Sequence, residues 1–310
     1  MVGLPLKILY IGLDNAGKSS IILTLQRDFS KIAILKPTKG AKQRIFDFLG
    51  LSVGEWDLGG QKLYRRTYFQ QADKIFGGTE IIIYVLDIQD KTRYNEALDY
   101  IKDVVEQLKI LEIEPAIYIF FHKYDPVDII GSQAEINNLS LELRDKIRSN
   151  FDYEHFDFYR TSIFDFQSII RAMSKILLTK IPRAKVIEKT IHEYSEKIEL
   201  DGLELIDDNS LIMGSYYRNR NIEKLMNAVT PFFLEINDTF NRVQVEEAYE
   251  EEDAEDQMMV QRFGKYFMFK KFKLKHGGSD FYVLTCKKDA DFKEEEFDIF
   301  INLMKEVLNL

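Results

Sequence analysis

The sequence has one cysteine, Cys286, and lacks any run of about 18 apolar residues. A single cysteine cannot form an internal disulfide, which excludes a disulfide scaffold and fits a reducing compartment. Residues 1–5 lack the basic segment and apolar core of a signal peptide, Val2 excludes N-myristoylation, and the end at Leu310 offers no cysteine for prenylation. We therefore expect a cytoplasmic protein without a membrane anchor of its own, so that any recruitment to a membrane would come from partners.

A basic patch is also missing, which argues against a nucleic-acid partner. The formal net charge is −9, but residues 246–256 alone hold eight acids and no base, and without them the net charge would be −1. The acidity is therefore confined to one segment. We predict that this segment, at 245–257, is a solvated loop, and the alternative is a binding site for a basic partner.

The length of 310 residues favours two domains. Short apolar runs at 6–11, 80–86 and 116–121 are typical of strands that are buried on both faces of a parallel sheet. Helical spacing follows at 18–29, 94–111 and 166–181, where Pro182 ends the pattern. The alternation predicts a three-layer α/β domain over residues 1–182.

The pattern changes after residue 182. We predict helices at 185–198, 222–243 and 294–310, two strands within 202–216, and further strands at 261–275 and 280–287. This order indicates a small α+β domain over residues 183–310. Phe297, Phe300, Ile301 and Met304 share one face of the last helix, which would contact either its own sheet or a partner.

The first chemical motif is Gly12-Leu13-Asp14-Asn15-Ala16-Gly17-Lys18-Ser19, the G-x-x-x-x-G-K-S phosphate loop. Its glycines let backbone N–H groups point inward, and the following helix adds its positive end. Lys18 would reach the β- and γ-phosphates, and the Ser19 hydroxyl would bind Mg²⁺. The alternative is a glycine-rich turn that arose by chance, but such a turn would not require a strand before it and a helix after it. The predicted phosphate contacts are Gly12, Asp14, Asn15, Ala16, Gly17, Lys18, Ser19 and Ser20.

The second motif is Asp57-Leu58-Gly59-Gly60-Gln61, at the end of a predicted strand. Asp57 would hold Mg²⁺, the N–H of Gly60 would meet the γ-phosphate, and Gln61 would orient the attacking water. The alternative is a strand-end turn with an unrelated glutamine. The predicted catalytic residues are Lys18, Gly60 and Gln61.

Thr38 lies in the segment between the first helix and this strand. A loop threonine there would close on Mg²⁺ and the γ-phosphate only while the γ-phosphate is bound, which is the behaviour of a switch loop. The alternative is an ordinary polar loop residue. The predicted metal ligands are Ser19, Thr38 and Asp57.

The third motif is His122-Lys123-Tyr124-Asp125. The Asp125 carboxylate would accept two hydrogen bonds from a guanine edge, which adenine does not offer. The stem of Lys123 would lie along the base, and the backbone N–H groups of Thr161, Ser162 and Ile163 would meet the guanine O6. The alternatives are a surface acid before Pro126 and a histidine that serves only packing.

These motifs, in this order, resemble those of the Ras superfamily of small GTPases. Residues 12–20 and Pro37-Thr38 are similar to Arf proteins. The H-K-x-D pattern at 122–125, Arg160-Thr161-Ser162-Ile163-Phe164-Asp165 and Ile181-Pro182 are more similar to the Rag/Gtr family. The resemblance covers residues 6–182 and implies a P-loop GTPase G domain that binds GTP or GDP with Mg²⁺. His122 replaces the asparagine of the usual N-K-x-D pattern and removes an amide that would tie the base loop to the phosphate loop.

The order of elements after residue 182 resembles the roadblock, or longin-like, domain that follows the G domain in Rag proteins. This resemblance implies dimerisation through residues 183–310, with a second copy or with a related Rag-like subunit. It also implies a roadblock-type scaffold, an exchange factor and a GTPase activator as partners.

We expect a regulatory GTPase that hydrolyses GTP slowly, because no arginine finger is evident and Arg65 and Arg66 are expected to be exposed bases. One alternative is a hydrolysis-deficient scaffold subunit that binds GTP and acts mainly in assembly. Intact Lys18, Asp57 and Gln61 argue against it. Another is a metabolic P-loop kinase or ATPase, which would need an acceptor site and an arginine-rich lid.

Overall fold

The computed structural model describes residues 4–127, 131–247, 257–273 and 280–309, and the chain divides into two compact units, Met1–Ala172 and Met173–Leu310. Among the described residues, no helix is both long and apolar enough to cross a membrane. The predicted acidic loop at 245–257 falls for the most part outside the described residues, which on its two sides end in a helix at Glu247 and resume in a strand at Gln257.

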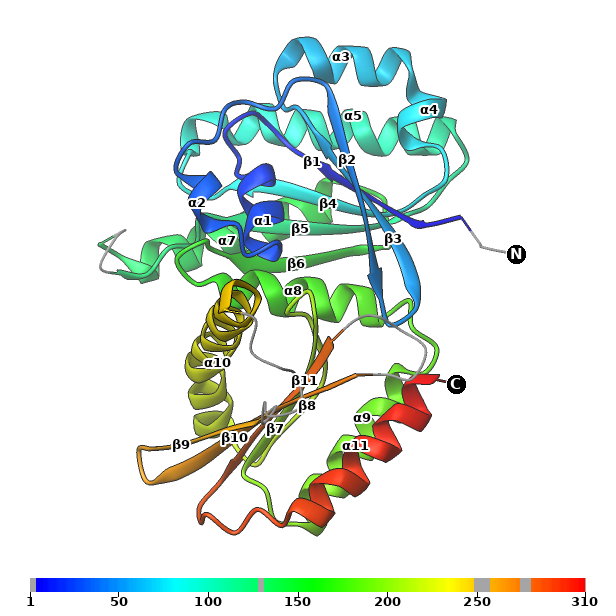
Figure 1. Cartoon of the computed structure of the whole chain (residues 1–310). Helices are drawn as coiled ribbons and strands as arrows, with labels where there is room; N and C mark the ends of the chain where they lie inside the picture. Colours follow the sequence, from blue (N-terminus) through cyan, green and yellow to red (C-terminus); the bar gives the residue numbers. More distant parts are fainter. Residues whose placement is uncertain (1–3, 128–130, 248–256, 274–279, 310) are drawn as a thin grey trace. The chain divides into compact units, whose positions relative to one another are not determined.

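The first unit is built on a six-stranded sheet, and its strand order is β2-β3-β1-β4-β5-β6 (Figure 1). Only β2 and β3 pair antiparallel; the other neighbours are parallel and require the crossover helices between them. This arrangement confirms the predicted α/β class. The strands are β1 (Leu6–Ile11), β2 (Ala41–Phe48), β3 (Leu51–Leu58), β4 (Thr79–Asp87), β5 (Ala116–His122) and β6 (Phe156–Thr161).

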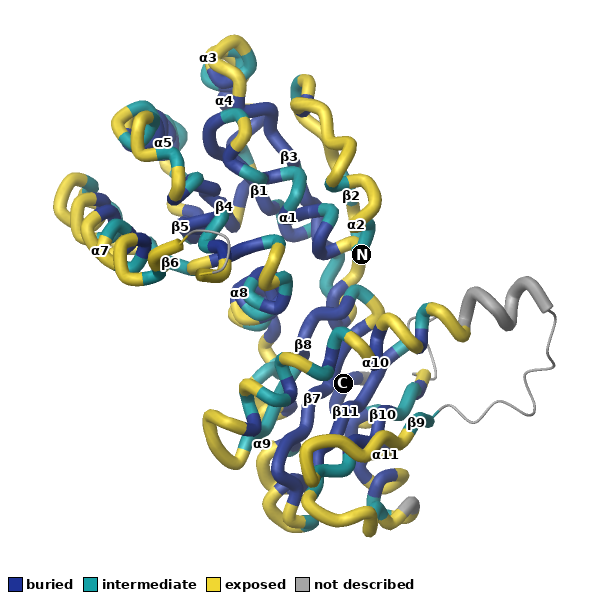
Figure 2. Tube along the Cα trace, turned by 90° about the vertical axis from the view of Figure 1, so that its left-hand side faces the viewer, coloured by how far each residue is buried: buried dark blue, intermediate teal, exposed yellow. Residues whose placement is uncertain are grey.

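Helices cover both faces of this sheet. The helices α3, α4, α5 and α7 lie on one face, and α1 and the first residues of α8 lie on the other (Figure 2). The predicted helix over 18–29 is wrong at its end, because Arg27 adopts a left-handed backbone (φ 54°) that stops α1. The helices are α1 (Lys18–Leu25), α2 (Phe29–Ile32), α3 (Lys62–Gln70), α4 (Ala72–Phe76), the 3₁₀ turn η1 (Lys91–Arg93), α5 (Tyr94–Ile110), α7 (Gln133–Asn150) and α8 (Phe166–Leu178).

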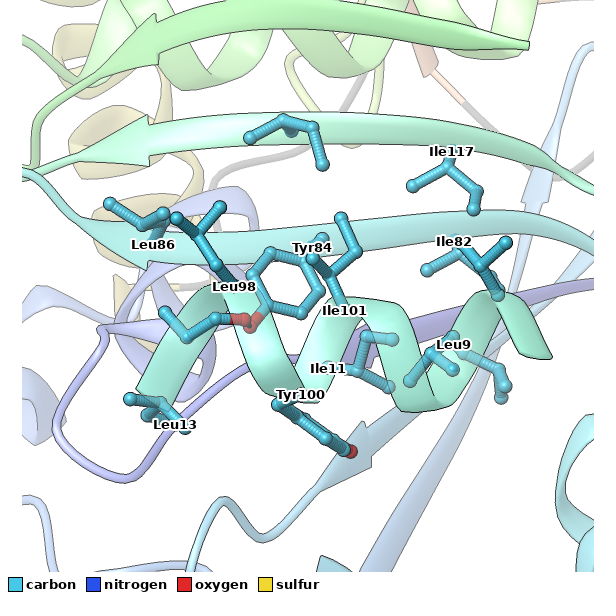
Figure 3. Packing of buried hydrophobic residues seen from close by; sticks show 14 of the residues in the cluster. Leu9, Ile11, Leu13, Ile82, Tyr84, Leu86, Leu98, Tyr100, Ile101 and Ile117 are labelled. Carbon is cyan, nitrogen blue, oxygen red and sulfur yellow. Dashed lines mark hydrogen bonds between the residues drawn. The ribbon is translucent and has the colours of Figure 1, made fainter. Parts of the chain in front are cut away.

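The core between the sheet and α5 fixes the strand ends that carry the motifs. Apolar side chains of β1, β4 and β5 meet Leu98, Tyr100 and Ile101 of α5 (Figure 3). The buried Tyr84 hydroxyl donates a hydrogen bond of 2.6 Å to the Ala97 carbonyl, which satisfies its polar atom. The carboxyl ends of β1, β4 and β5 are thereby held at one edge, where ligands bind in open α/β sheets.

The second unit has a five-stranded antiparallel sheet with the order β8-β7-β11-β10-β9. Helix α10 packs on one face, and α9 and α11 lie on the other (Figure 1). The helix–two strands–helix–strands–helix order agrees with the predicted α+β domain. Its elements are α9 (Ala184–Lys197), β7 (Gly202–Asp207), β8 (Ile212–Tyr217), α10 (Arg220–Glu247), β9 (Gln257–Arg262), β10 (Lys265–Lys273), β11 (Asp280–Lys287) and α11 (Glu294–Asn309).

The single strand predicted over 261–275 is wrong. The segment belongs to a hairpin of β9 and β10 that turns at Phe263 and Gly264, with φ angles of 53° and 66°. Positive φ at both central residues is what the tight type I′ hairpin turn requires.

The last helix packs on its own unit. Phe297, Phe300, Ile301 and Met304 are all buried, and the ring of Tyr194 stacks on Phe300 with centroids 4.3 Å apart. Of the two interpretations of this face, packing within the domain is therefore the one observed. Cys286 of β11 is fully buried in the cluster beneath α10, and burial raises the pKa of its thiol to about 12.

Candidate functional site

The loop between β1 and α1 curls as the phosphate-loop motif predicts. Gly12, Asn15 and Gly17 all have positive φ, and a Cβ on Gly12 would lie 2.2 Å from the Val85 carbonyl oxygen, so only glycine fits there. The ammonium of Lys18 donates to the carbonyls of Gly12 and Leu13, at 3.0 and 2.7 Å. Burial lowers the pKa of Lys18 to about 8.

This loop forms one wall of a cavity of about 220 Å³. The opposite wall comes from the segment before β2 and from the turn between β3 and α3. The lining residues are Asp14, Asn15, Gly17, Lys18, Ser19, Ser20, Leu35, Lys36, Pro37, Thr38, Gly60 and Gln61.

Three oxygen-bearing side chains meet at this cavity although they lie far apart in the sequence. The hydroxyls of Ser19 and Thr38 lie 2.8 Å apart and donate to Oδ2 of Asp57 at 2.6 and 3.0 Å. The other carboxylate oxygen of Asp57 is buried and has no hydrogen-bond partner among the described residues. Hard oxygen ligands of this kind suit Mg²⁺, so the three residues fit the predicted ion.

Gly59, Gly60 and Gln61 connect β3 to α3 beside the phosphate loop. The backbone of Gly60 lies directly against Leu13 and Asp14, and a Cβ there would be 2.2 Å from the Asp14 nitrogen. Any other residue at position 60 would therefore have to displace the phosphate loop. Gln61 stands immediately before α3 and makes no side-chain capping hydrogen bond to it; this exposed residue lines the cavity.

The motif after β5 lies next to the end of β6. Asp125 is buried, and its two carboxylate oxygens accept hydrogen bonds from Ser162 Oγ at 2.6 Å and Gln89 Nε2 at 2.7 Å. The interpretation of Asp125 as a surface acid is therefore wrong. Lys123 adopts a left-handed backbone, and its ammonium pairs with Asp87 Oδ2 at 2.5 Å.

Of the predicted N–H donors after β6, the one of Ser162 already donates to Ser168 Oγ at 3.0 Å. Thr161 is buried, and its carbonyl accepts from the backbone N–H of Tyr124 at 3.0 Å. The loop that starts with Thr161, Ser162 and Ile163 is thus fastened to the motif that contains Asp125.

His122 joins the base loop to the phosphate loop by packing. Its ring is buried against Gly17, where a Cβ would lie 2.3 Å from the ring Cδ2. Its Nδ1 lies 3.0 Å from Thr161 Oγ1. Burial lowers the pKa of His122 to about 3, so the ring is neutral. The two loops therefore touch directly despite the lost amide.

Sequence reasoning missed three residues and misplaced one. Asp87 is the last residue of β4, and Gln89 and Arg93 follow it; only their place at the carboxyl end of a buried strand could have pointed to them. The prediction that Arg65 is exposed is wrong, because it is buried, pairs with Glu96 and lies 4.9 Å over the ring of Tyr100. Arg66 is exposed as expected.

Comparison with known proteins shows which family shares this sequence. The conserved region of Gtr1/RagA G proteins matches residues 7–243. The chain belongs to the Gtr1/RagA family. It is 26% identical over 247 residues to Ras-related GTP-binding protein A of Dictyostelium discoideum, a match that covers 74% of this chain and 77% of that protein. The predicted Rag/Gtr relationship is confirmed, and this Gtr1/RagA-family chain is a GTPase that binds guanine nucleotide.

Further proteins similar to this family member are an ADP-ribosylation factor, a second Ras-related GTP-binding protein and a small GTPase of known structure. ADP-ribosylation factor F of Dictyostelium discoideum is 33% identical over 136 residues, which cover 44% of this chain and 68% of that protein. Ras-related GTP-binding protein B of Rattus norvegicus is 28% identical over 202 residues, 60% of this chain and 50% of that protein. Among solved structures, the Arl6 BBS3 small GTPase of Trypanosoma brucei with bound GppNp matches 57% of this chain and 97% of its own, with 20% identity and a TM-score of 0.44.

Proposed function

We propose that this GTPase is a molecular switch that hydrolyses GTP slowly and senses the γ-phosphate through Thr38 and Gly60. The observation that carries the proposal is the meeting of Ser19, Thr38 and Asp57 at the phosphate loop. Thr38 belongs to the segment before β2, whereas Asp57 is the penultimate residue of β3, so an ion bound at this point would connect two separate segments. Loss of the γ-phosphate would release both, as in other switches.

The proposed roles follow from chemistry and position. Lys18 compensates phosphate charge, the N–H of Gly60 meets the γ-phosphate, and Gln61 orients the attacking water. Ser19, Thr38 and Asp57 hold Mg²⁺, which when bound neutralises charge on the β- and γ-phosphate oxygens. The proposed phosphate contacts are Gly12, Asp14, Asn15, Ala16, Gly17 and Ser20, of which Asp14, Asn15, Gly17 and Ser20 line the cavity.

Guanine is recognised by Asp125, with Lys123 and His122 on one side and the loop of Thr161, Ser162 and Ile163 on the other. Guanine offers this buried carboxylate two donors on one edge, and adenine does not, which supports selection of guanine. Chromatography of the nucleotide released from the denatured protein tests this pocket. GDP or GTP is the expected product, and ATP would contradict the assignment.

Slow turnover is proposed because Arg65 is engaged by Glu96 and Arg93 by Asp14 and Glu96. An arginine from an activator would add roughly 10³–10⁵ in rate. Gln61→Leu should hold the protein in the GTP form, with single-turnover hydrolysis reduced at least about tenfold because the water loses its orienting amide. Gln70→Leu, an exposed glutamine at the end of α3, is the matched control. Unchanged hydrolysis in Gln61→Leu would refute its role, and a wild type that never hydrolyses GTP would favour the scaffold alternative.

We further propose that the chain dimerises through residues 183–310 with a second copy or a related Rag-like subunit. Phe232, Ile236 and Phe240 recur every fourth residue on α10 and are 64%, 41% and 58% exposed. Within the described residues, the edge strand β9 pairs with β10 alone and exposes Met259 and Val260. Apolar side chains beside a strand edge with unpaired backbone groups support association with another chain.

A further inference from the structure

Asp14 places a carboxylate in the phosphate loop. It lines the same cavity as Lys18 and Gln61, and its backbone nitrogen lies against Gly60. The side chain is 43% exposed and so keeps contact with solvent. A negative charge at this point repels the phosphates that the cavity is built to hold, and the repulsion is strongest for the added charge of a γ-phosphate.

Arg93 holds this carboxylate from the opposite side. Its Nη2 donates to Asp14 Oδ1 at 2.8 Å, and its Nη1 donates to the Asp14 carbonyl oxygen at 3.1 Å. The guanidinium therefore donates hydrogen bonds to both the side chain and the backbone of Asp14. It comes from η1, immediately before α5, and so from a different segment than any phosphate contact proposed above.

Arg93 also pairs with a second carboxylate, that of Glu96. Its Nε donates to Glu96 Oε2 at 3.0 Å, and the other oxygen of Glu96 pairs with Arg65 of α3. The four charges alternate in sign and sum to zero. Because Glu96 and Asp14 together engage three of its nitrogens, Arg93 acts on the phosphate loop rather than on the phosphates themselves.

We propose that Arg93 is a positioning residue for the triphosphate: it neutralises Asp14 and holds its carboxylate toward α5, so that the cavity accepts a γ-phosphate. This inference rests on the GTPase function proposed above. It predicts that Arg93 matters more for GTP than for GDP, because only GTP brings charge to the end of the cavity at Gly60.

The test compares affinities of the full-length chain for a non-hydrolysable GTP analogue and for GDP, both with Mg²⁺, by titration calorimetry. Arg93→Ala should weaken binding of the analogue about tenfold more than binding of GDP, a size in keeping with repulsion between two charges at a partly solvated site. Adding Asp14→Asn to Arg93→Ala should return the ratio of the two affinities to within about threefold of the wild type, because the repelling charge is gone. Lys91→Ala removes the same charge from the same turn, where Lys91 pairs with Glu135 at the surface, and should leave the ratio unchanged.

The outcomes separate the two proposals. An equal loss of both affinities in Arg93→Ala, or no recovery in the double variant, would show that Arg93 only supports the fold and would overturn the inference while leaving the GTPase assignment intact. Thermal unfolding of each variant identifies a folding defect, and the double variant, which lacks the same arginine, keeps the comparison informative. A wild type that binds neither nucleotide would overturn the proposed function and this inference together.

Discussion

At the scale of single residues, His122 shows how one substitution within a motif can be compensated. An asparagine at this position would supply an amide hydrogen bond, whereas His122 supplies a buried ring that fills the space against Gly17 and meets Thr161. Gly17 must be glycine for two reasons, its left-handed backbone (φ 99°) and the ring beside it. The contact between the two loops therefore depends on shape complementarity.

The buried ring has a consequence for pH dependence. The pKa of His122 is lowered to about 3, below the usual value of about 6.5 in an unfolded chain. Between these values the unfolded state binds the extra proton, so acidification favours unfolding. The free energy of unfolding should therefore fall by about 2 kcal/mol more between pH 7 and pH 5 in the wild type than in His122→Asn.

Urea unfolding at the two pH values measures this difference. His155→Asn, a change at an exposed histidine, should behave like the wild type. An equal fall in wild type and His122→Asn would mean that His122 gains its proton in the folded protein.

At the scale of secondary-structure elements, a buried polar cluster connects β1, β2 and β3. The Tyr10 hydroxyl of β1 donates to Glu55 Oε1 of β3 at 2.7 Å, and Arg44 of β2 approaches Glu55 Oε2 at 3.4 Å. Burial raises the pKa of Glu55, while its hydrogen bond to Tyr10 and the charge of Arg44 oppose that rise. The cluster stands next to Asp57 on the same strand, so it helps to fix the register of the strand that carries a proposed metal ligand.

Tyr10→Phe should lower the free energy of unfolding by about 1–3 kcal/mol, because a buried carboxyl loses a hydrogen-bond donor. Equilibrium unfolding in urea gives the value. Combining Tyr10→Phe with Glu55→Leu should recover part of the loss, since both polar partners are then replaced by apolar groups. A Tyr10→Phe variant as stable as the wild type would show that the hydroxyl adds nothing to this cluster.

The elements also show what the sequence could predict. The phosphate loop, the Asp57–Gln61 segment and Asp125 were predictable because each is contiguous and follows a buried strand. The edge strand β2, which is mostly exposed, and α7, which buries only Ile136, Ser140, Leu143 and Ile147, have weak apolar patterns and went unpredicted. The β9–β10 hairpin was missed because its Phe-Gly turn lacks the usual Asn or Asp at the first central position. Gln89 and Arg93 act through contacts between distant segments, which no local spacing encodes.

At the scale of the whole molecule, the family match at residues 7–243 extends from the first compact unit into the second. The second unit buries its own sheet beneath helices on both faces, yet leaves the apolar row of α10 exposed. Exposed apolar patches are typical of protein–protein contacts, and this row is the physical ground for the proposed dimer.

Phe232→Asp combined with Phe240→Asp should abolish association, because two charges would be desolvated at the contact. Light scattering after size exclusion measures the mass of the full-length chain, alone and mixed with a related Rag-like subunit. Ile299→Asp is the control, since Ile299 is 65% exposed on α11, away from this row. If the α10 variant keeps the wild-type mass in both samples, the contact lies elsewhere.

Cys286, the one cysteine of the sequence, is buried, and burial raises the pKa of its thiol, so we expect the native chain to react slowly with thiol reagents. A fluorophore attached to a cysteine introduced at an exposed position of α3, such as Leu63, would therefore label that position alone. The wild-type background thus permits a real-time optical record of the helix that follows Gln61 during nucleotide exchange, without removing any native side chain elsewhere.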